Sequence, residues 1–129
     1  MNRNIIILLS TYNGKRFIKI LLNSLFNQTY KNIEIIARDD GSSDNTLEIL
    51  QSYDIKILDE KKNLGVQKSF NRLLEYALQN TEAQYFMFCD QDDIWLPNKI
   101  EISLAKIKEL EQKYAEAPPL LVFTDMKVV

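Results

Sequence analysis

The feature that most limits the fold of this chain is the alternation of short apolar runs with segments of helical period. Runs rich in β-branched or aromatic residues predict strands at residues 4–9, 33–37, 55–58, 85–89 and 120–123. Between them, apolar residues recur every three or four positions, as in a helix with one buried face. Strands that alternate with helices predict an α/β fold, a Rossmann-like parallel sheet sandwiched by helices, with every strand buried on both faces.

The predicted helices have recognisable ends. A first helix of roughly 14 residues carries Ile18, Leu21, Leu22 and Leu25 on one face. Ser43 or Asp44 is expected to cap a second helix. The segment 63–65 opens a third helix, and Pro97 begins a fourth, which Pro118 and Pro119 end.

The length of 129 residues fits one domain, which we assign to residues 1–129. The sequence stops at Val129, shortly after the last predicted strand and without a closing helix. We therefore expect this domain to be truncated at its C-terminus, as a piece of a longer protein.

Residues that the chain lacks exclude several kinds of chemistry. It has no histidine, so catalytic triads and histidine–metal sites cannot form within it. Its three glycines are too scattered for a glycine-rich phosphate loop. The net charge of −2 and a pI near 5.2 argue against nucleic acid as a partner.

The early apolar run at residues 5–9 is too short for a membrane span or a signal-peptide core. The single cysteine, Cys89, cannot form an internal disulfide, which agrees with a reducing compartment. These two observations predict a cytoplasmic protein.

Polar clusters follow three of the predicted strands at their carboxyl ends, where open parallel sheets bind ligands. They occupy residues 10–14, 39–42 and 90–93. The last cluster, Asp90-Gln91-Asp92-Asp93, places three carboxylates within four residues, and a divalent cation would relieve their repulsion. Oxygen ligands without histidine or cysteine favour Mg²⁺ or Mn²⁺. The alternative is that these carboxylates cap the next turn or face water.

The other two clusters also allow two interpretations. An ionised Asp39 or Asp40 can accept the N3–H of uracil or thymine, but an Asp-Gly-Ser segment also forms a turn and a helix cap by itself. The ring of Tyr12 can stack on a nucleobase, or it can cover the edge of the core. For Lys68 a solvated helix start is the favoured interpretation, and for Trp95 it is core packing under the acidic loop.

Taken together, these residues resemble a known family. Ser10-Thr11-Tyr12-Asn13, Asp39-Asp40-Gly41-Ser42, Asn63-x-Gly65 with Asn71, and Asp90-x-Asp92-Asp93 with Pro97 follow in the order and spacing of glycosyltransferase family 2, the inverting enzymes of GT-A fold. The resemblance covers essentially the whole chain. The segments 88–95 and 121–125 are most similar to bacterial rhamnosyltransferase-like members that build surface polysaccharides.

The resemblance implies roles for individual residues. Ser10 and Tyr12 would line the base pocket, and Asp40 would pair with the pyrimidine. Asp90 and Asp92 would form the D-x-D element beside the donor's diphosphate, with Asp92 as the direct metal ligand. The catalytic base of the family lies beyond this region, so we expect it after Val129. Asp125 does not match the position of the base, and Ser69 stands where some relatives carry a nucleotide-contacting arginine.

We therefore expect transfer of a sugar, with inversion, from a UDP- or dTDP-sugar donor to a saccharide or lipid-linked saccharide acceptor. The full-length protein would then associate peripherally with the inner face of the membrane. Two alternatives stay open: a non-catalytic nucleotide-sugar-binding module, and a sugar nucleotidyltransferase. The second is disfavoured because residues 10–14 contain a single glycine and no basic residue.

Overall fold

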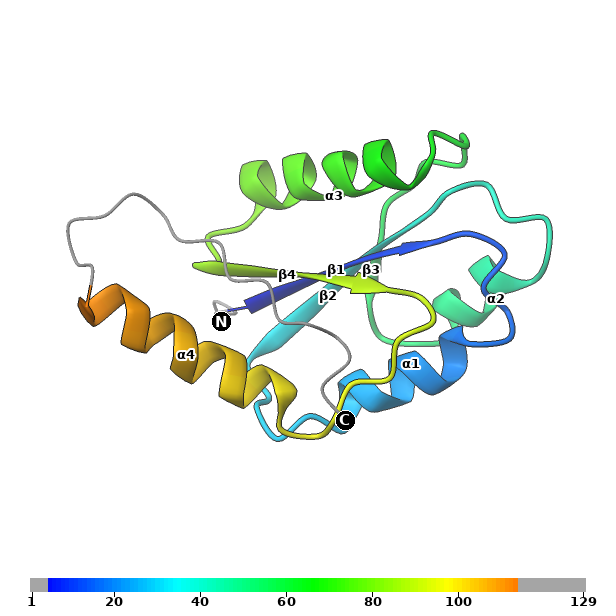
Figure 1. Ribbon diagram of the computed structural model, residues 1–129. Helices are drawn as coiled ribbons and strands as arrows, with labels where there is room; N and C mark the ends of the chain where they lie inside the picture. Colours follow the sequence, from blue (N-terminus) through cyan, green and yellow to red (C-terminus); the bar gives the residue numbers. More distant parts are fainter. Residues whose placement is uncertain (1–4, 114–129) are drawn as a thin grey trace.

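A computed structural model describes residues 5–113, which form a parallel sheet with helices on both faces (Figure 1). Along the chain the elements are β1 (Ile5–Thr11), α1 (Ile18–Phe26), β2 (Ile33–Asp39), α2 (Thr46–Gln51), β3 (Lys56–Ile57), α3 (Val66–Asn80), β4 (Tyr85–Asp90) and α4 (Lys99–Lys113). The predicted strand at 120–123, the two prolines at 118–119 and Asp125 lie outside the described residues. The predicted α/β class is confirmed.

The sheet has the order β3-β2-β1-β4, and all of its pairs are parallel. β1 is paired on both sides, so Leu9 lies between Ala37 of β2 and Cys89 of β4. The same register places Ser10 opposite both Arg38 and Asp90. The carboxyl ends of these strands therefore meet at one edge of the sheet.

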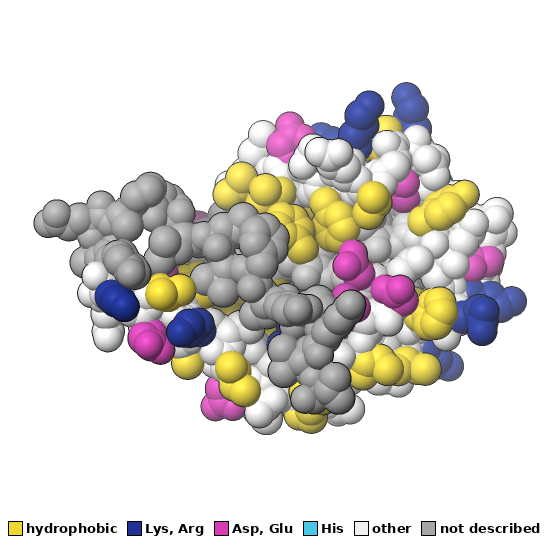
Figure 2. Space-filling view, viewed as in Figure 1, with side chains coloured by type: hydrophobic (Ala, Val, Ile, Leu, Met, Phe, Trp, Pro, Cys, Tyr) yellow, Lys and Arg dark blue, Asp and Glu magenta, His cyan; other side chains and the backbone are white. Residues whose placement is uncertain are grey.

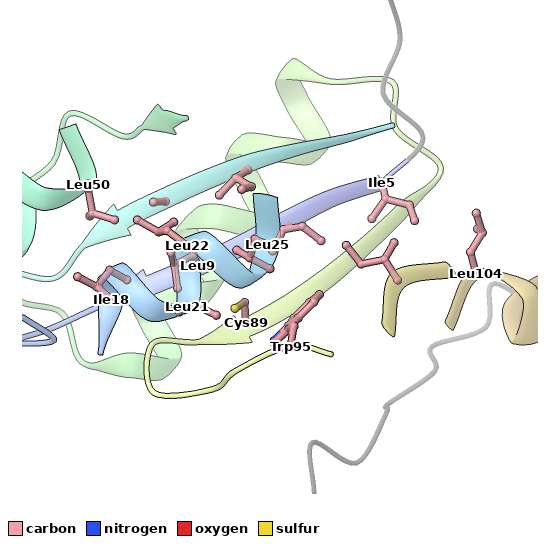
Figure 3. Close-up of a cluster of buried hydrophobic side chains, with 14 residues drawn as sticks. Ile5, Leu9, Ile18, Leu21, Leu22, Leu25, Leu50, Cys89, Trp95 and Leu104 are labelled. Carbon is pink, nitrogen blue, oxygen red and sulfur yellow. The ribbon is translucent and has the colours of Figure 1, made fainter. Parts of the chain in front are cut away.

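The side chains of β1 alternate between two cores because successive residues of a strand point to opposite faces. Ile5, Ile7 and Leu9 pack in the core that α1 and α4 cover, which Figure 3 shows in close-up. Ile6 and Leu8 pack with Leu73 and Ala77 of α3 on the other face. All seven residues of β1 are buried, as predicted for a strand covered on both sides.

β4 differs from that prediction. Five of its six residues are partly buried or exposed and only Cys89 is buried, and Phe88 is 38% exposed. Within residues 5–113, β4 pairs only with β1, and the contacts of α3 with the sheet are mainly to β1 and β2. An apolar run can therefore belong to the half-exposed border of a sheet, and its composition does not reveal this.

The first helix is also shorter than predicted, because α1 has nine residues. The segment before it is held in a loop, in which Asn13 has a positive φ of 47°. The backbone N–H of Asn13 donates to Ser42 Oγ at 2.8 Å, and that of Gly14 donates to Thr46 Oγ1 at 2.9 Å. These bonds to Ser42 in the turn after β2 and to Thr46 at the start of α2 compete with the first turn of a helix.

The expected helix starts are largely correct. Asp44 accepts the backbone N–H of Thr46, the first residue of α2, at 2.9 Å, although the N-cap position itself is Asn45, whose side chain makes no cap bond. Gly65 precedes α3 with a φ of 89°, a conformation that side chains disfavour. A search of the helices within the described residues finds none with the length and apolarity needed to cross a bilayer.

A substitution within α1 tests the assignment of its buried face. Leu22 is fully buried and Ile20 is 54% exposed. Leu22→Ala should lower the free energy of unfolding by about 2–5 kcal/mol, because it removes buried methyl groups and leaves a cavity. Ile20→Ala, the matched control, should change it by less than about 1 kcal/mol. Urea denaturation with an unchanged m-value measures both, and equal losses would refute the assignment.

Candidate functional site

A hollow of about 680 Å³ lies where the carboxyl ends of β1, β2 and β4 meet the start of α3. Its lining combines residues from four separate segments of the chain: Ser10, Thr11, Tyr12, Asp40, Asn63, Gly65, Val66, Asp90, Gln91 and Asp92. Figure 2 shows a group of acidic side chains on the face where β4 ends in Figure 1. The structure thus brings together all five residues that the sequence analysis singled out, Ser10, Tyr12, Asp40, Asp90 and Asp92.

Asp40 is held almost completely out of water, with 3% of its surface exposed. Its Oδ1 accepts hydrogen bonds from Arg38 Nη1 and from the backbone N–H of Leu64, both at 2.7 Å. Its Oδ2 accepts the backbone N–H of Gly65 at 3.0 Å. Burial alone raises the pKa of Asp40, but these bonds and the charge of Arg38 outweigh it and hold the pKa below its ordinary value. Asp40 is therefore ionised at neutral pH, and Oδ2, which accepts one bond among the described residues, has the capacity to accept a second.

Arg38 is a buried cation that the sequence analysis did not identify. Besides Asp40, its guanidinium donates to Glu60 Oε1 at 2.9 Å, to the carbonyl of Lys62 at 2.7 Å and to Ser69 Oγ at 3.1 Å. It is 0% exposed. A signal for it was present: an arginine inside a strand predicted to be buried on both faces requires buried anionic partners.

Ser10 lines the hollow, but its hydroxyl bonds toward the interior. Its Oγ donates to Ser69 Oγ at 2.7 Å, and Ser69 is fully buried. Ser69 therefore belongs to the Arg38 network and does not line this hollow. Lys68 is exposed at the start of α3, in agreement with the solvated interpretation.

The two neighbouring aspartates have different surroundings. Asp39 accepts Thr11 Oγ1 at 2.8 Å, the backbone N–H of Ser42 at 2.9 Å and Ser42 Oγ at 2.6 Å. These bonds close the turn after β2, so the turn interpretation is correct for Asp39. Only Asp40 reaches the hollow.

Tyr12 does not cover the edge of the core, because 49% of it is exposed at the hollow. Both of its backbone polar groups bond to the side chain of Gln91. The N–H of Tyr12 donates to Gln91 Oε1 at 2.8 Å, and Gln91 Nε2 donates to the carbonyl of Tyr12 at 2.9 Å. The ring thus stands on a fixed backbone and remains available for stacking.

The acidic loop presents two of its three carboxylates to the hollow. Asp90 and Asp92 are exposed and line it. Asp93 is partly buried, and its Oδ2 is a buried atom without a hydrogen-bond partner among the described residues. Burial first, and then the charges of Asp90 and Asp92, raise the pKa of Asp93. Trp95 packs in the core at 2% exposure beneath this loop, as expected.

The carboxylates of Asp90 and Asp92 suit a divalent cation that also binds a ligand. Between residues 5 and 113, no three side chains of histidine, cysteine, aspartate or glutamate converge on one ion position. Asp90 and Asp92 can supply one or two carboxylate oxygens, which is what Mg²⁺ takes where substrate phosphates and water complete its shell. The residues present thus suit Mg²⁺ or Mn²⁺ bound together with a phosphate, but not an all-protein cage.

A second hollow of about 570 Å³ lies at the opposite end of the sheet, beside the start of β2. Its charged lining residues are Lys31, Glu34, Asp54 and Lys56. Opposite charges alternate there, so this hollow lacks the concentrated charge of the first.

Comparison with known proteins identifies the family. The model of the family described as glycosyl transferase family 2 matches residues 6–116. The chain belongs to glycosyltransferase family 2. The resemblance inferred from the ordered motifs is thereby confirmed.

Curated relatives of this glycosyltransferase domain include an uncharacterised glycosyltransferase of Rickettsia conorii, 40% identical over 83% of this chain and 18% of the relative. Another is the UDP-Glc:alpha-D-GlcNAc-diphosphoundecaprenol beta-1,3-glucosyltransferase WfgD of Escherichia coli. WfgD is 35% identical over 77% of this chain and 39% of its own length. The chain thus spans well under half of each of these relatives.

Solved structures of other glycosyltransferases share the fold. TarS of S. aureus (residues 1–349, in complex with UDP) matches with a TM-score of 0.71 and 29% identity, over 84% of this chain and 32% of that one. A mannosyltransferase of Pyrobaculum calidifontis, solved with GDP-Man and Mn²⁺, matches with a TM-score of 0.66 and 19% identity, over 86% of this chain and 33% of that one. The predicted GT-A fold is confirmed.

The buried ion pair between Arg38 and Asp40 should contribute more to the stability of this domain than its exposed ion pairs. Arg38→Met leaves the carboxylate of Asp40 buried without its cation, and should lower the free energy of unfolding by about 3–5 kcal/mol. Arg72→Met is the matched control, because Arg72 also pairs with Glu60 but its side chain is 45% exposed. Because the pair of Arg72 with Glu60 is partly exposed, its loss should shift the urea midpoint clearly less than the loss of Arg38. Equal midpoint shifts in the two variants would contradict the buried role of Arg38.

Glu60 gives the domain a defined acid sensitivity. Bonds from Arg72 and then Arg38 lower the pKa of Glu60 from 4.5 to about 2. Its stabilising contribution is therefore complete above pH 4.5 and is lost as the pH falls toward 2. Glu60→Gln should lower the free energy of unfolding by about 1–2 kcal/mol at pH 7, since the side chain is partly exposed.

The difference between wild type and Glu60→Gln should shrink as the pH is lowered from 4.5 toward 2, as followed by urea denaturation at each pH. Glu75→Gln serves as control, because Glu75 pairs with Arg72 while its side chain is 58% exposed. A difference that is independent of pH would show that the ionised pair does not contribute.

Proposed function

We propose that residues 1–129 form the donor-binding domain of a glycosyltransferase and that its hollow binds the nucleoside diphosphate of a UDP- or dTDP-sugar. The observation that carries this proposal is the convergence of Tyr12, Asp40, Asp90 and Asp92 on one hollow at the carboxyl edge of a parallel sheet. TarS, a structural relative, was solved in complex with UDP, which supports a uridine nucleotide.

The base would lie between Tyr12 and Asp40. The half-exposed ring of Tyr12 offers a stacking surface worth roughly 1–3 kcal/mol for a nucleobase. Oδ2 of the ionised Asp40 would accept the N3–H of uracil or thymine. Cytosine has no proton at N3, so it could not donate a hydrogen bond to Oδ2 of Asp40. The site should therefore reject it.

The diphosphate would lie beside Asp90 and Asp92, with Asp92 as the direct metal ligand. When bound, Mg²⁺ or Mn²⁺ would neutralise the charge that develops on the departing nucleoside diphosphate. The chain itself orients the carboxylates on a loop that is anchored below by the buried Trp95. Ser10 would contribute the wall of the pocket, since its hydroxyl is engaged with Ser69.

The full-length protein would then transfer the sugar with inversion: an acceptor hydroxyl attacks the anomeric carbon opposite the diphosphate while a carboxylate removes its proton. We assign this base to none of the described residues and expect it beyond Val129. The name of WfgD specifies UDP-Glc and a diphosphoundecaprenol-linked acceptor. We extend that class to this protein: a saccharide or lipid-linked saccharide acceptor, in surface polysaccharide synthesis, in the cytoplasm at the inner face of the membrane.

Calorimetric titration with UDP, with and without Mn²⁺, tests the donor site. Loss of a group that supports a metal ligand typically lowers metal affinity or activity by roughly 10–100-fold, and loss of a direct ligand should cost at least as much. Asp92→Ala should therefore weaken UDP binding with Mn²⁺ by roughly tenfold or more. Binding without metal should change little. Asp54→Ala removes an exposed carboxylate at the opposite hollow and is the control. If Asp92→Ala leaves the gain from Mn²⁺ intact, the metal assignment is wrong.

Transfer of radiolabelled sugar by the full-length protein separates an enzyme from a non-catalytic binding module. Nucleotide binding without any transfer, across UDP- and dTDP-sugars and saccharide acceptors, would favour the binding module.

A further inference from the structure

Gln91, the residue between the two D-x-D aspartates, joins two loops that are far apart in the sequence. Its amide accepts from the N–H of Tyr12 at 2.8 Å and donates to the carbonyl of Tyr12 at 2.9 Å. Two roughly parallel bonds from one planar amide fix orientation as well as distance. We call this pair of bonds the Gln91–Tyr12 clasp.

The amide of Gln91 occupies the space that a side chain at Gly14 would need. A Cβ atom added at Gly14 would lie 2.3 Å from Gln91 Oε1 and 2.8 Å from Gln91 Cδ. These distances are far inside van der Waals contact, so any side chain at position 14 displaces the amide of Gln91. Gly14 is itself anchored through its N–H to Thr46 Oγ1. A glycine in the base loop and a glutamine in the acidic loop are therefore matched to one another.

We propose that Gln91 is a positioning residue, which sets the distance between the base-binding loop at Tyr12 and the metal- and phosphate-binding loop at Asp90 and Asp92. This inference rests on the proposed function. A nucleoside diphosphate is one molecule with its base at one end and its charge at the other. A ligand held by both loops gains full affinity only when their spacing matches its length, as for two linked binding modules.

The chemistry of the clasp specifies glutamine. Glutamate has two acceptor oxygens at neutral pH and no donor for the carbonyl of Tyr12, and it would add a fourth carboxylate to the loop of Asp90, Asp92 and Asp93. Alanine removes both bonds. The base loop keeps its other anchors, the bonds from Asn13 to Ser42 and from Gly14 to Thr46, so loss of the clasp should uncouple the two loops without unfolding either.

Three titrations of the full-length protein test this: uridine, UDP with EDTA, and UDP with Mn²⁺. In Gln91→Ala the improvement in UDP affinity brought by Mn²⁺ should fall by about tenfold, the cost typical of a group that orients metal ligands. Uridine affinity should stay within about twofold of the wild type, and the thermal midpoint should barely move. Gln79→Ala, an exposed glutamine on α3, is the control and should change none of these.

Gly14→Ala provides an independent route to the same state, because its new methyl group expels the Gln91 amide. It should reproduce the loss seen in Gln91→Ala. The double variant should be no worse than Gln91→Ala alone, since the clash disappears with the side chain. Additive losses, or an equal weakening of uridine and UDP with a lowered thermal midpoint, would overturn the positioning role.

The outcomes also separate this inference from the proposed function. If the wild type gains no UDP affinity from Mn²⁺, the proposed donor site fails, and this inference fails with it. If the wild type gains affinity and Gln91→Ala gains as much, only the positioning role is refuted.

Discussion

The pairing of β1 with a parallel strand on each side is the constraint on which the rest of this structure depends. Because Ser10 lies opposite both Arg38 and Asp90, the loops that follow β1, β2 and β4 meet at one point. The pairing is stable because β1 is buried on both faces, by α1 and α4 on one side and α3 on the other. Burial of a seven-residue apolar strand thus determines where the polar residues of the site can gather.

The same burial creates an electrostatic problem that the Arg38 network solves. A carboxylate at position 40 would be costly in so dry a place, and its pKa would rise. The guanidinium of Arg38 and two backbone N–H groups before α3 keep Asp40 charged, while Glu60, Ser69 and the carbonyl of Lys62 accept the other bonds of the guanidinium. The network also ties β2 to α3, so the shape of the hollow and the charge of Asp40 depend on the same bonds.

The sequence predicted the parts of this arrangement that follow from pattern. The hydrophobic periodicity predicted the order of the elements, the strand ends predicted three polar clusters, and the family resemblance selected Tyr12, Asp40, Asp90 and Asp92 within them. It did not predict that β4 is half-exposed, because composition does not reveal a strand's neighbours. Nor did it reveal that Asp39 closes a turn through bonds to Thr11 and Ser42, or that Arg38 and Gln91 hold the site together. These properties depend mainly on contacts between residues from 22 to 79 positions apart.

The negative charge of the lining bears on how a cation and a diphosphate would bind in the hollow. The lining of the hollow contains three carboxylates and no lysine or arginine. Arg38, behind it, balances Asp40, whereas none of the ion pairs within residues 5–113 involves Asp90 or Asp92. A diphosphate that approaches these two carboxylates alone is repelled, whereas a divalent cation between them reverses the sign of the interaction. Under the proposed function, the base half of the site would bind by itself, whereas the phosphate half would bind a diphosphate only together with a cation, so the spacing between the two halves would become part of the recognition.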